Sequence, residues 1–489
     1  MINFRHRISF LALSACIFIA GCRKDSWDKR SRITDPNLRE NLMQAVSANP
    51  DLSQFASYLA KTGYDKVISS SKNFTVWAPT NEALKNVPDS EVNDTARLRL
   101  LVENHIANQM YLTSMATPTL RIKTLSGKYI EFSETAVNDA NIVDADKYTN
   151  NGVLHTIDKA LIPEPNIWEY LNTRYAGSLQ QQYLSSLQYM FVDPDSAEQI
   201  GVDPQTGVPI YQPGTGLVSR NRFLQKVNLD DEDSLLTYII LTNTAYTQQQ
   251  TALSPYFTDT TAAETDSITQ WNIVKDLAFV GAYSPDSLPG VLYSANDSVQ
   301  FHLSKGDIVE SHKLSNGMVY VVNAANYDLA TKIKPIKILG PRFLDRLDAT
   351  KSYTIRTRRN PETDTLFNDI YLANYGLSAY WFRYPVVVNS IHYKVYWMAV
   401  NDFQTGTFPM RLAFKSHTDT AFADPTNIPF DYLMPYQTVN VGDYSEVYLG
   451  EYNASLYGNL DVFLIGNNVT TNGSNTIVLN YIKLVPILN

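Results

Sequence analysis

The chain has 489 residues, a formal net charge of −9 and an apolar content of 44%. This length predicts two to four domains, and this apolar content is enough to form several packed cores. Charged residues make up only 18% while tyrosines number 31, a mixture that argues against a disordered or coiled-coil protein and favours β-rich domains. An acidic surface repels phosphate backbones, so nucleic acid is not expected as a partner.

The first 21 residues have the pattern of a removable targeting segment. A basic start precedes an apolar run that is too short for a permanent membrane span. The run ends in IAGC, residues 19–22, which resembles a bacterial lipobox. The resemblance implies cleavage after residue 21 and lipidation of Cys22; the alternative is an ordinary secretory signal with an incidental cysteine. Residues 22–35 are polar and charged, as expected of a tether.

Cysteine usage agrees with this interpretation. The chain has two cysteines, and Cys16 lies in the segment that is predicted to be removed. A lipidated Cys22 leaves no thiol for a disulfide or for a metal site. We therefore expect folds held by packing alone, in an outer-membrane lipoprotein whose domains face the cell exterior.

From residue 36 the apolar residues recur at steps of three and four, which predicts helices with one buried face. The strand FTVWAP then ends at Pro79, which has no N–H for a ladder. Either Thr80 or Asn81 is expected to cap the helix that follows.

Two segments carry a family resemblance. FTVWAPTNEAL, residues 74–84, and NGVLHTIDKALIP, residues 151–163, resemble the two signatures of fasciclin (FAS1) domains. The resemblance covers residues 36–163 and implies an α+β fold in which a twisted sheet packs against helices. It places Asn151, Gly152 and His155 among the signature residues.

Both signatures recur farther along the chain. TYIILTNTAY, residues 237–246, aligns without gaps to residues 75–84, and NGMVYVVNAA, residues 316–325, aligns to the second signature. The near-constant offset predicts a duplicated, divergent FAS1 domain at residues 164–335. A stretch rich in Pro, Gly and Asp, residues 192–216, is expected to be an inserted loop. The matched positions are Thr80 and Thr242, Asn81 and Asn243, Asn151 and Asn316, and Gly152 and Gly317.

These matched residues are expected to build the fold. A Thr-Asn pair ends a strand and caps a helix, and an Asn-Gly pair makes a tight turn into a strand because glycine accepts a positive φ. We expect no catalytic role for either pair.

Residues 336–489 show alternating patterns of short strands separated by turn clusters, which predict an all-β sandwich. Their end resembles that of galactose-binding-like jelly rolls, and this resemblance implies carbohydrate binding. Aromatic rings pack on the C–H faces of sugars, and filling of the sandwich core is the alternative role for such rings. The candidate ligand-binding residues are Trp381, Arg383, Trp397 and Tyr444.

No catalytic motif is found, and we expect no cofactor and no metal site. The sequence lacks a G-x-S-x-G elbow, an H-E-x-x-H pair and a phosphate-binding glycine loop. The acidic run DDED, residues 230–233, does not have the spacing of a calcium loop and is expected to be a solvated turn.

Three functions follow. The first is a non-catalytic surface adhesion lipoprotein resembling tandem fasciclin lipoproteins of Bacteroidetes type, with a glycan as partner, as an accessory component of a nutrient-uptake system. The second is a structural adhesion or matrix protein that docks to a neighbouring surface protein. The third is a glycan-active enzyme, which requires two carboxylates about 5–9 Å apart in a cleft. Exposed rings at Trp381 and Trp397 would favour the first, and buried rings the second.

Mass spectrometry of protein isolated from its own cells tests the predicted anchor. Cys22 is expected to be the new N-terminus, with acyl chains on its sulfur and its amino group. An unmodified sulfur on Cys22 would contradict the lipoprotein prediction.

Overall fold

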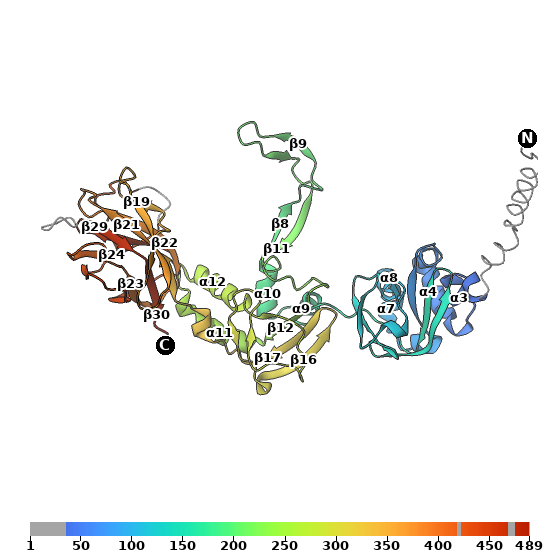
Figure 1. Ribbon diagram of the computed structural model, residues 1–489. Coiled ribbons are helices and arrows are strands. Elements are labelled where there is room, and N and C mark those ends of the chain that lie inside the picture. The colour runs from blue at the N-terminus through green and yellow to red at the C-terminus, as the bar shows by residue number, and fades with distance from the viewer. Residues whose placement is uncertain (1–35, 418–421, 468–474, 489) are drawn as a thin grey trace, which may run out of the picture. The chain divides into compact units, whose positions relative to one another are not determined.

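The computed structural model describes residues 36–417, 422–467 and 475–488 (Figure 1). The described chain divides into two compact units: the first contains residues 36–166 with Asp231–Ser234 and Leu314–Asn316, and the second contains the remaining described residues. Cys22, its signal segment and its tether lie outside the described residues. Among the described residues, no helix combines the length and the apolarity needed to cross a membrane.

The first unit packs a group of helices against a seven-stranded sheet of order β2-β1-β7-β6-β5-β4-β3. Leu42, Val46, Phe55 and Leu59, which follow the predicted helical spacing, are all buried in one core with Val76 of the sheet. The elements are α3 Leu42–Ser47, α4 Ser53–Thr62, α5 Tyr64–Val67, β1 Phe74–Pro79, α6 Asn81–Leu84, α7 Asp89–Asn93, α8 Thr95–Glu103, β2 Ile106–Ala107, β3 Leu120–Lys123, β4 Tyr129–Phe132, β5 Ala136–Val137, β6 Ala140–Thr149 and β7 Gly152–Ile157.

The end of β1 is tied to two helices. Thr80 is the N-cap of α6, because its side chain accepts a hydrogen bond from the N–H of Ala83 at 3.1 Å. Asn81 instead reaches the start of α4: its Oδ1 accepts from the N–H of Gln54 at 2.9 Å, and its Nδ2 donates to the carbonyl of Pro50 at 3.0 Å. Of the two predicted caps, therefore, Thr80 has that role, and Asn81 joins separate elements.

Gly152 permits β7 to lie beside β1. The two strands are parallel, and Gly152 is the direct partner of Phe74. A Cβ on Gly152 would lie 2.1 Å from the carbonyl oxygen of Phe74, so only glycine allows this approach. The preceding Asn151 is buried, and its Nδ2 donates to the carbonyls of Ile68 and Ser70, both at 2.7 Å. The Asn-Gly pair thus fixes strand pairing as well as the expected turn.

The second unit begins with helices and a four-stranded sheet of order β13-β12-β17-β16. All six residues of β12 and of β17 are buried. The elements are α9 Ile167–Arg174, α10 Leu179–Ser186, β12 Leu236–Leu241, α11 Asn243–Leu253, α12 Ala262–Val274, β13 Ala278–Val280, β14 Leu292–Tyr293, β15 Gln300–Phe301, β16 Ile308–Leu314, β17 Gly317–Val322 and α13 Leu329–Lys332.

This sheet repeats the strand pairing of the first unit. β12 and β17 are parallel, with Gly317 opposite Leu236, and a Cβ on Gly317 would lie 1.8 Å from the carbonyl oxygen of Leu236. Thr242 caps α11 through the N–H of Ala245 at 3.3 Å. The Oδ1 of Asn243 accepts from the N–H at the first residue of α10, Leu179, at 2.9 Å.

Residues 188–221 form a projecting β-structure, which we call the arm (Figure 1). The stretch expected to be an inserted loop, residues 192–216, consists mainly of turns and contains the short strands β9 and β10. Two antiparallel ladders make up the arm: β8 Gln188–Val192 pairs with β11 Leu217–Asn221, and β9 Gln199–Val202 pairs with β10 Pro209–Tyr211.

The C-terminal part is all β and has one principal core. The inward faces of two sheets, β18-β30-β23-β27 and β19-β22-β28-β24-β25, supply alternate apolar residues to it, and the third sheet, β20-β21-β29, also supplies apolar residues from β21 and β29. The strands are β18 Ile336–Leu339, β19 Asp345–Arg346, β20 Thr354–Arg359, β21 Leu366–Ala373, β22 Trp381–Val388, β23 His392–Met398, β24 Phe408–Ser416, β25 Tyr432–Leu433, β26 Gln437–Val439, β27 Val447–Asn453, β28 Gly458–Gly466, β29 Thr476–Leu479 and β30 Tyr481–Pro486.

Substitution of the two strand-initiating glycines tests the strand pairing. Gly152→Ala and Gly317→Ala are each expected to lower the free energy of unfolding by about 2 kcal/mol or more, because the carbonyl that the new Cβ meets is part of a paired strand. Urea unfolding followed by hydrogen-exchange mass spectrometry reads the two sheets separately.

Gly290→Ala is the matched control, because a Cβ at Gly290 meets no atom within 4 Å. A loss of stability in Gly152→Ala no greater than in this control would contradict the close-approach argument.

Candidate functional site

His155 of the first unit is buried and its ring is fully engaged. Its Nε2 lies 2.9 Å from the carbonyl oxygen of Tyr111, and its Nδ1 accepts from the N–H of Asp146 at 3.3 Å. The ring stacks on Trp77 with centroids 6.0 Å apart. Burial lowers the pKa of His155, so the neutral ring is favoured. The residue holds strands together and offers no surface to a ligand.

The position that matches His155 is occupied by Tyr320, which makes an equivalent bond. The hydroxyl of Tyr320 donates to the carbonyl of Tyr283 at 2.8 Å. Tyr111 and Tyr283 correspond, since the N–H of Tyr111 donates to the hydroxyl of Thr75 and the N–H of Tyr283 donates to that of Thr237. Tyrosine at the position of histidine therefore keeps the corresponding carbonyl paired.

His105 is also a structural residue. It has no solvent exposure, its Nδ1 lies 2.7 Å from the carbonyl oxygen of Leu101, and its Nε2 accepts from the N–H of Leu161 at 2.8 Å. Burial lowers the pKa of His105 to about 4, so the ring is neutral at physiological pH.

The structure places Trp381 and Trp397 in the interior, with 3% and 1% of each residue exposed. The indole N–H of Trp381 donates to the carbonyl of Pro425 at 2.8 Å, and its ring packs edge-on against Phe463. Trp397 lies in the main core of the β-domain. Neither ring presents a flat face to a ligand, because both point to the inside of a sheet layer.

Arg383 is held by a buried carboxylate. Its Nη2 donates to Oδ2 of Asp461 at 2.6 Å, and Nδ1 of His417 lies 2.8 Å from the other oxygen of Asp461. Asp461 is fully buried. A buried carboxylate needs a paired charge and hydrogen bonds, and Arg383 supplies both to Asp461. Arg383 therefore has a structural role.

Tyr444 is half-buried and its hydroxyl donates to Oδ2 of Asp402 at 2.9 Å. Asp402 also forms an ion pair with Arg358. Nearby in the same network, Arg356 makes a bidentate pair with Asp369, at 2.9 and 2.6 Å. Burial and the neighbouring Asp402 raise the pKa of Tyr444, so it remains a hydroxyl donor. Of the four predicted ligand-binding residues, none is placed beside another in an open site.

A partly exposed group of aromatic and charged side chains covers the outer side of β18-β30-β23-β27. Tyr396 and Tyr448 are cross-strand partners with ring centroids 5.3 Å apart, and Tyr448 is 49% exposed. Nζ of Lys483 pairs with Glu446 at 2.9 Å and lies 6.0 Å from the ring centre of Tyr396. This group, here called the tyrosine face, consists of Lys337, Tyr396, Glu446, Tyr448, Tyr481 and Lys483.

The tyrosine face could have been found from strand alternation. In β23 the side chains of Tyr393, Val395 and Trp397 point inward, so the intervening Tyr396 points outward. Sequence reasoning selected the largest ring, Trp397, and large rings in such strands favour the core. Tyr448 carries no local signal that separates it from other exposed tyrosines.

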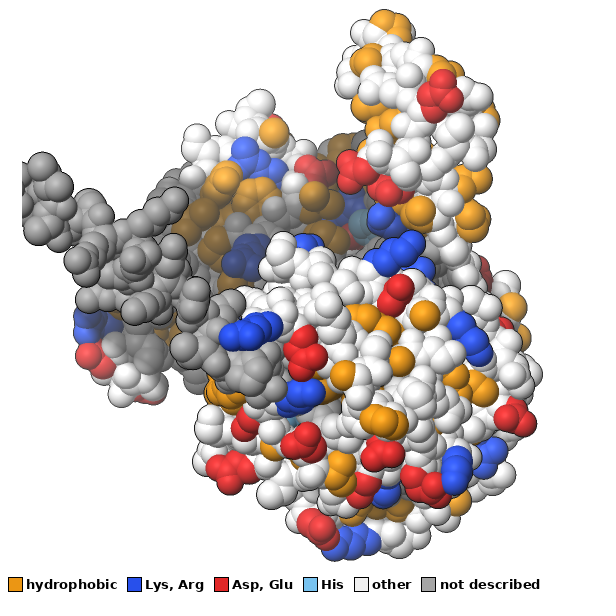
Figure 2. Space-filling model, turned by 90° about the vertical axis from the view of Figure 1, so that its right-hand side faces the viewer, with side chains coloured by type: hydrophobic (Ala, Val, Ile, Leu, Met, Phe, Trp, Pro, Cys, Tyr) orange, Lys and Arg blue, Asp and Glu red, His pale blue; other side chains and the backbone are white. Residues whose placement is uncertain are grey.

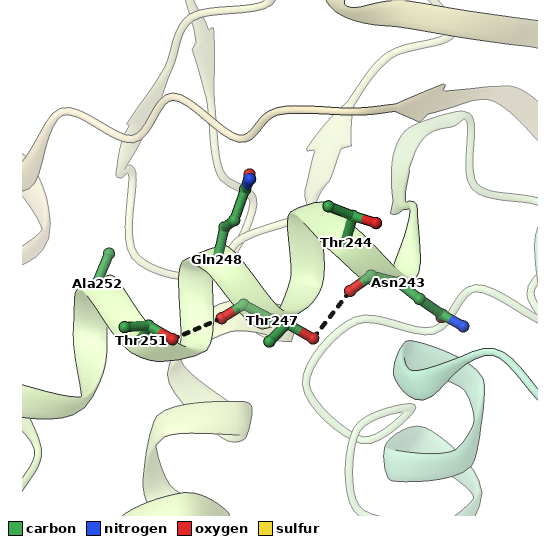
Figure 3. A pocket seen from close by; sticks show the side chains of 6 residues that line it. All are labelled: Asn243, Thr244, Thr247, Gln248, Thr251 and Ala252. Carbon is green, nitrogen blue, oxygen red and sulfur yellow. Dashed lines mark hydrogen bonds between the residues drawn. The ribbon is translucent and has the colours of Figure 1, made fainter.

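Two hollows lie beside α11. One, of about 640 Å³, is a shallow depression over one face of the helix, lined by Asn243, Thr244, Thr247, Gln248, Thr251 and Ala252 (Figure 3). The hydroxyls of Thr247 and Thr251 donate to carbonyls of their own helix, both at 3.0 Å. The second hollow, of about 500 Å³, includes His302 and Tyr327. Neither brings together the convergent polar groups of a catalytic pocket.

The acidic run at residues 230–233 is a turn that is partly solvated, as expected: Asp230 and Asp233 are exposed, whereas Glu232 is largely covered. Glu232 accepts from Nζ of Lys128 at 2.6 Å, with 14% and 13% of the two side chains exposed, and Asp233 pairs with Lys123 at 2.6 Å. Two of its four carboxylates, those of Glu232 and Asp233, are thus paired with lysines. Among the described residues, no group of three or more His, Cys, Asp or Glu side chains has a metal-binding arrangement.

The family described as "Fasciclin domain" matches residues 50–163. These residues are a fasciclin domain. The match includes both signatures and the contacts of Thr80, Asn151 and His155 described above.

Curated relatives match the same part of the chain. Transforming growth factor-beta-induced protein ig-h3 of Oryctolagus cuniculus is 29% identical over 133 residues, which cover 25% of this chain and 20% of the relative. Periostin of Homo sapiens is also 29% identical over 133 residues, covering 25% and 16%. The similarity thus spans about a fifth of the length of these relatives.

Among solved structures, a FAS1 domain pair from the insect cell adhesion molecule fasciclin I aligns with 58% of this chain and all of its own, at 14% identity and a TM-score of 0.23. A TM-score of this size does not establish a shared arrangement. The fasciclin assignment therefore applies to residues 50–163.

The pH dependence of the fasciclin domain's stability tests the burial of His105. Because its folded pKa of about 4 lies below the ordinary value of 6.5, the unfolded chain binds more protons between these pH values. The stabilisation is complete above pH 6.5 and is lost as the pH falls toward 4, by roughly 3 kcal/mol at most. Urea unfolding at pH 7, 6 and 5 measures this slope.

His105→Gln should make the dependence of the unfolding free energy on pH shallower in the fasciclin domain and leave that of the second unit unchanged. Hydrogen-exchange mass spectrometry of peptides from each unit reads the two separately. An identical slope in wild type and variant would contradict the burial argument.

Proposed function

We propose that the protein is a non-catalytic adhesion protein of the cell surface that docks to a neighbouring surface protein. The observation that carries the proposal is the fasciclin domain at residues 50–163, whose signature side chains are occupied in holding the fold. Such a domain serves as a scaffold, and its binding is expected on outward surfaces.

Residues 164–335 are proposed to be a second, divergent FAS1 domain. Support comes from the repeated parallel strand pair, the repeated threonine cap and the repeated asparagine contact to an earlier helix. Residues 336–489 are proposed to be a β-sandwich of the galactose-binding-like jelly-roll type, supported by the two sheets that share one core.

Residues 164–335 and the β-domain are joined by hydrogen bonds, which supports a role as a rigid platform. The N–H of Ser390 donates to the carbonyl of Tyr256 at 3.0 Å, and the N–H of Tyr457 donates to that of Thr258 at 2.7 Å. Phe257 packs edge-on against Tyr457 with centroids 5.3 Å apart. Docking forces on the β-domain would therefore be transmitted to the rest of the unit.

Burial of Trp381 and Trp397 favours a protein partner over a glycan, because the rings chosen for sugar stacking are inside the fold. Glycan binding, as an accessory component of a nutrient-uptake system, is the second candidate. It is supported by the tyrosine face, where Tyr448 is half exposed beside charged groups that could bond hydroxyls.

The proposed protein is attached to the membrane by a lipid. A lipid on Cys22 would attach the chain to the outer membrane, and the charged tether at residues 22–35 would carry the domains away from it. Lipidation would supply the membrane contact without a spanning helix.

Binding of the mature protein to outer-membrane fractions of its own cells tests the two candidates together. Protease treatment of the fraction is expected to abolish binding, and periodate oxidation of its glycans is expected to leave binding intact. Loss after periodate alone, together with at least about a tenfold loss in Tyr448→Ala, would establish the glycan candidate instead.

Tyr293→Ala is the matched control, since Tyr293 is an exposed tyrosine on β14. An untreated fraction that binds no protein above background would contradict both candidates.

A further inference from the structure

The arm is the part of the second unit that its own fold explains least. Among the described residues, β8 pairs with β11 and β9 pairs with β10, and neither ladder joins a larger sheet. The arm stands clear of the helices and the sheet from which it arises (Figure 1). An isolated two-stranded ladder is only marginally stable in water, so pairing with another chain would stabilise the arm.

Apolar side chains lie exposed along both ladders. Val192 and Leu217 are direct cross-strand partners, and Met190 lies on the same face, where it is 60% exposed. Figure 2 shows orange apolar side chains along the projection at the upper right, with red acidic ones among them. The exposed apolar residues of the arm are Met190, Val192, Ile200, Val202, Val208, Ile210 and Leu217.

An apolar surface of this kind exceeds what the fold requires. Met190, Val192 and Leu217 form one apolar group on a face of the β8-β11 ladder, and the other four aliphatic residues are distributed over the two faces of the β9-β10 ladder, all of them 38–60% exposed. Exposed apolar groups of this kind can mark interaction sites.

The strand edges of the arm are open in addition to its faces. Each two-stranded ladder leaves its outer N–H and C=O groups unpaired by any third strand in the described chain. Lysine, which commonly protects exposed edges, is absent from residues 188–221. Open edges beside apolar side chains suit the addition of an extended segment from another chain.

The charge of the arm indicates the charge expected of the segment that binds it. The arm has four carboxylates, at Asp193, Asp195, Glu198 and Asp203, against one cation, Arg220. The guanidinium of Arg220 lies over the ring of Phe191, 3.7 Å from its centre. A partner with Lys or Arg would be attracted.

The same charge disfavours other occupants. A second arm or an anionic lipid surface would bring like charges together. The face of the β8-β11 ladder that carries Met190, Val192 and Leu217 also lacks the flat rings on which sugars pack, which disfavours a glycan on that face.

We propose that the arm binds a partner protein through an extended segment in which basic and aliphatic residues alternate. The segment adds as a third strand to the edge of an arm ladder. Its aliphatic side chains cover Met190, Val192 and Leu217, and its basic side chains lie near Asp193 and Asp195. This inference rests on the proposed adhesion function, for which it supplies the docking site and the chemistry of the partner.

A fluorescent peptide of about eight alternating Lys and Val residues is the probe, and its anisotropy with the full mature chain is the measurement. The peptide is expected to bind, and to bind at least about tenfold more weakly when Met190→Ser, Val192→Ser and Leu217→Ser are combined. Methylation of alternate backbone nitrogens should weaken it by a similar factor, because the peptide then cannot pair as a strand. Asp193→Asn with Asp195→Asn should weaken it and reduce its salt dependence.

Val280→Ser combined with Val309→Ser is the control, since both valines are exposed aliphatic residues on strands outside the arm, 68% and 59% exposed. The control is expected to bind the peptide as wild type does. The arm residues are exposed, so the thermal unfolding midpoint of the triple variant should match that of wild type. Equal affinity in wild type and triple variant, or equal affinity for the methylated peptide, would overturn the proposal.

Two other occupants appear as distinct outcomes. A dimer in sedimentation that is lost in the triple variant would overturn the proposal in favour of a second copy. Flotation with phosphatidylethanolamine–phosphatidylglycerol vesicles that is lost in the same variant would overturn it in favour of a membrane.

The outer-membrane experiment separates this inference from the function on which it rests. Protease-sensitive binding that persists in the triple variant would overturn the arm as the docking site while leaving adhesion in place. Peptide binding without any binding to outer-membrane fractions would overturn adhesion while leaving the arm as a strand-binding element.

Discussion

The contact of a glycine with the carbonyl of a neighbouring parallel strand is the constraint on which both mixed sheets depend. Gly152 lies against Phe74, and Gly317 lies against Leu236, with no room for a Cβ at either position. This contact sets the register, so the last paired residues are also equivalent. The N–H of Thr80 donates to the carbonyl of Ile157 at 3.1 Å, just as the N–H of Thr242 donates to that of Val322 at 2.9 Å. Each threonine therefore lies at the point where its helix begins.

Once the register is set, hydrogen bonds matter more than residue identity. The first sheet uses His155 and the second uses Tyr320 to pair a carbonyl in the same place. Histidine and tyrosine differ in size and charge, yet both bury an aromatic ring and direct a polar atom at the carbonyl. A part-buried carbonyl without a partner is costly, and both sheets pair this carbonyl, each through a different residue. Thr75 and Thr237 have the same role, because the hydroxyl of each donates to a carbonyl and accepts from an N–H of a neighbouring segment.

Local physics made part of the structure predictable from sequence. The cap at Thr80, the buried face of the first helices and the strands that precede each cap depend on neighbouring residues, and the structure contains them. The partner of Asn81 was not predictable in this way, because Gln54 lies 27 residues earlier. At residues 192–216 composition predicted the turns but not the short strands β9 and β10 that these turns connect. The opposite directions of Trp397 and Tyr396 follow from strand alternation, but which of the two faces of β23 is covered depends on the sheet that the strand joins.

The repeated strand-and-cap arrangement is the central claim, and an experimental structure of the mature chain tests it most directly. The account predicts that β12, β17 and Thr242 superpose on β1, β7 and Thr80, with Asn243 bonded to the first turn of α10 as Asn81 is bonded to that of α4. A structure in which β12 and β17 are not adjacent parallel strands, or in which Asn243 makes no such contact, would contradict it.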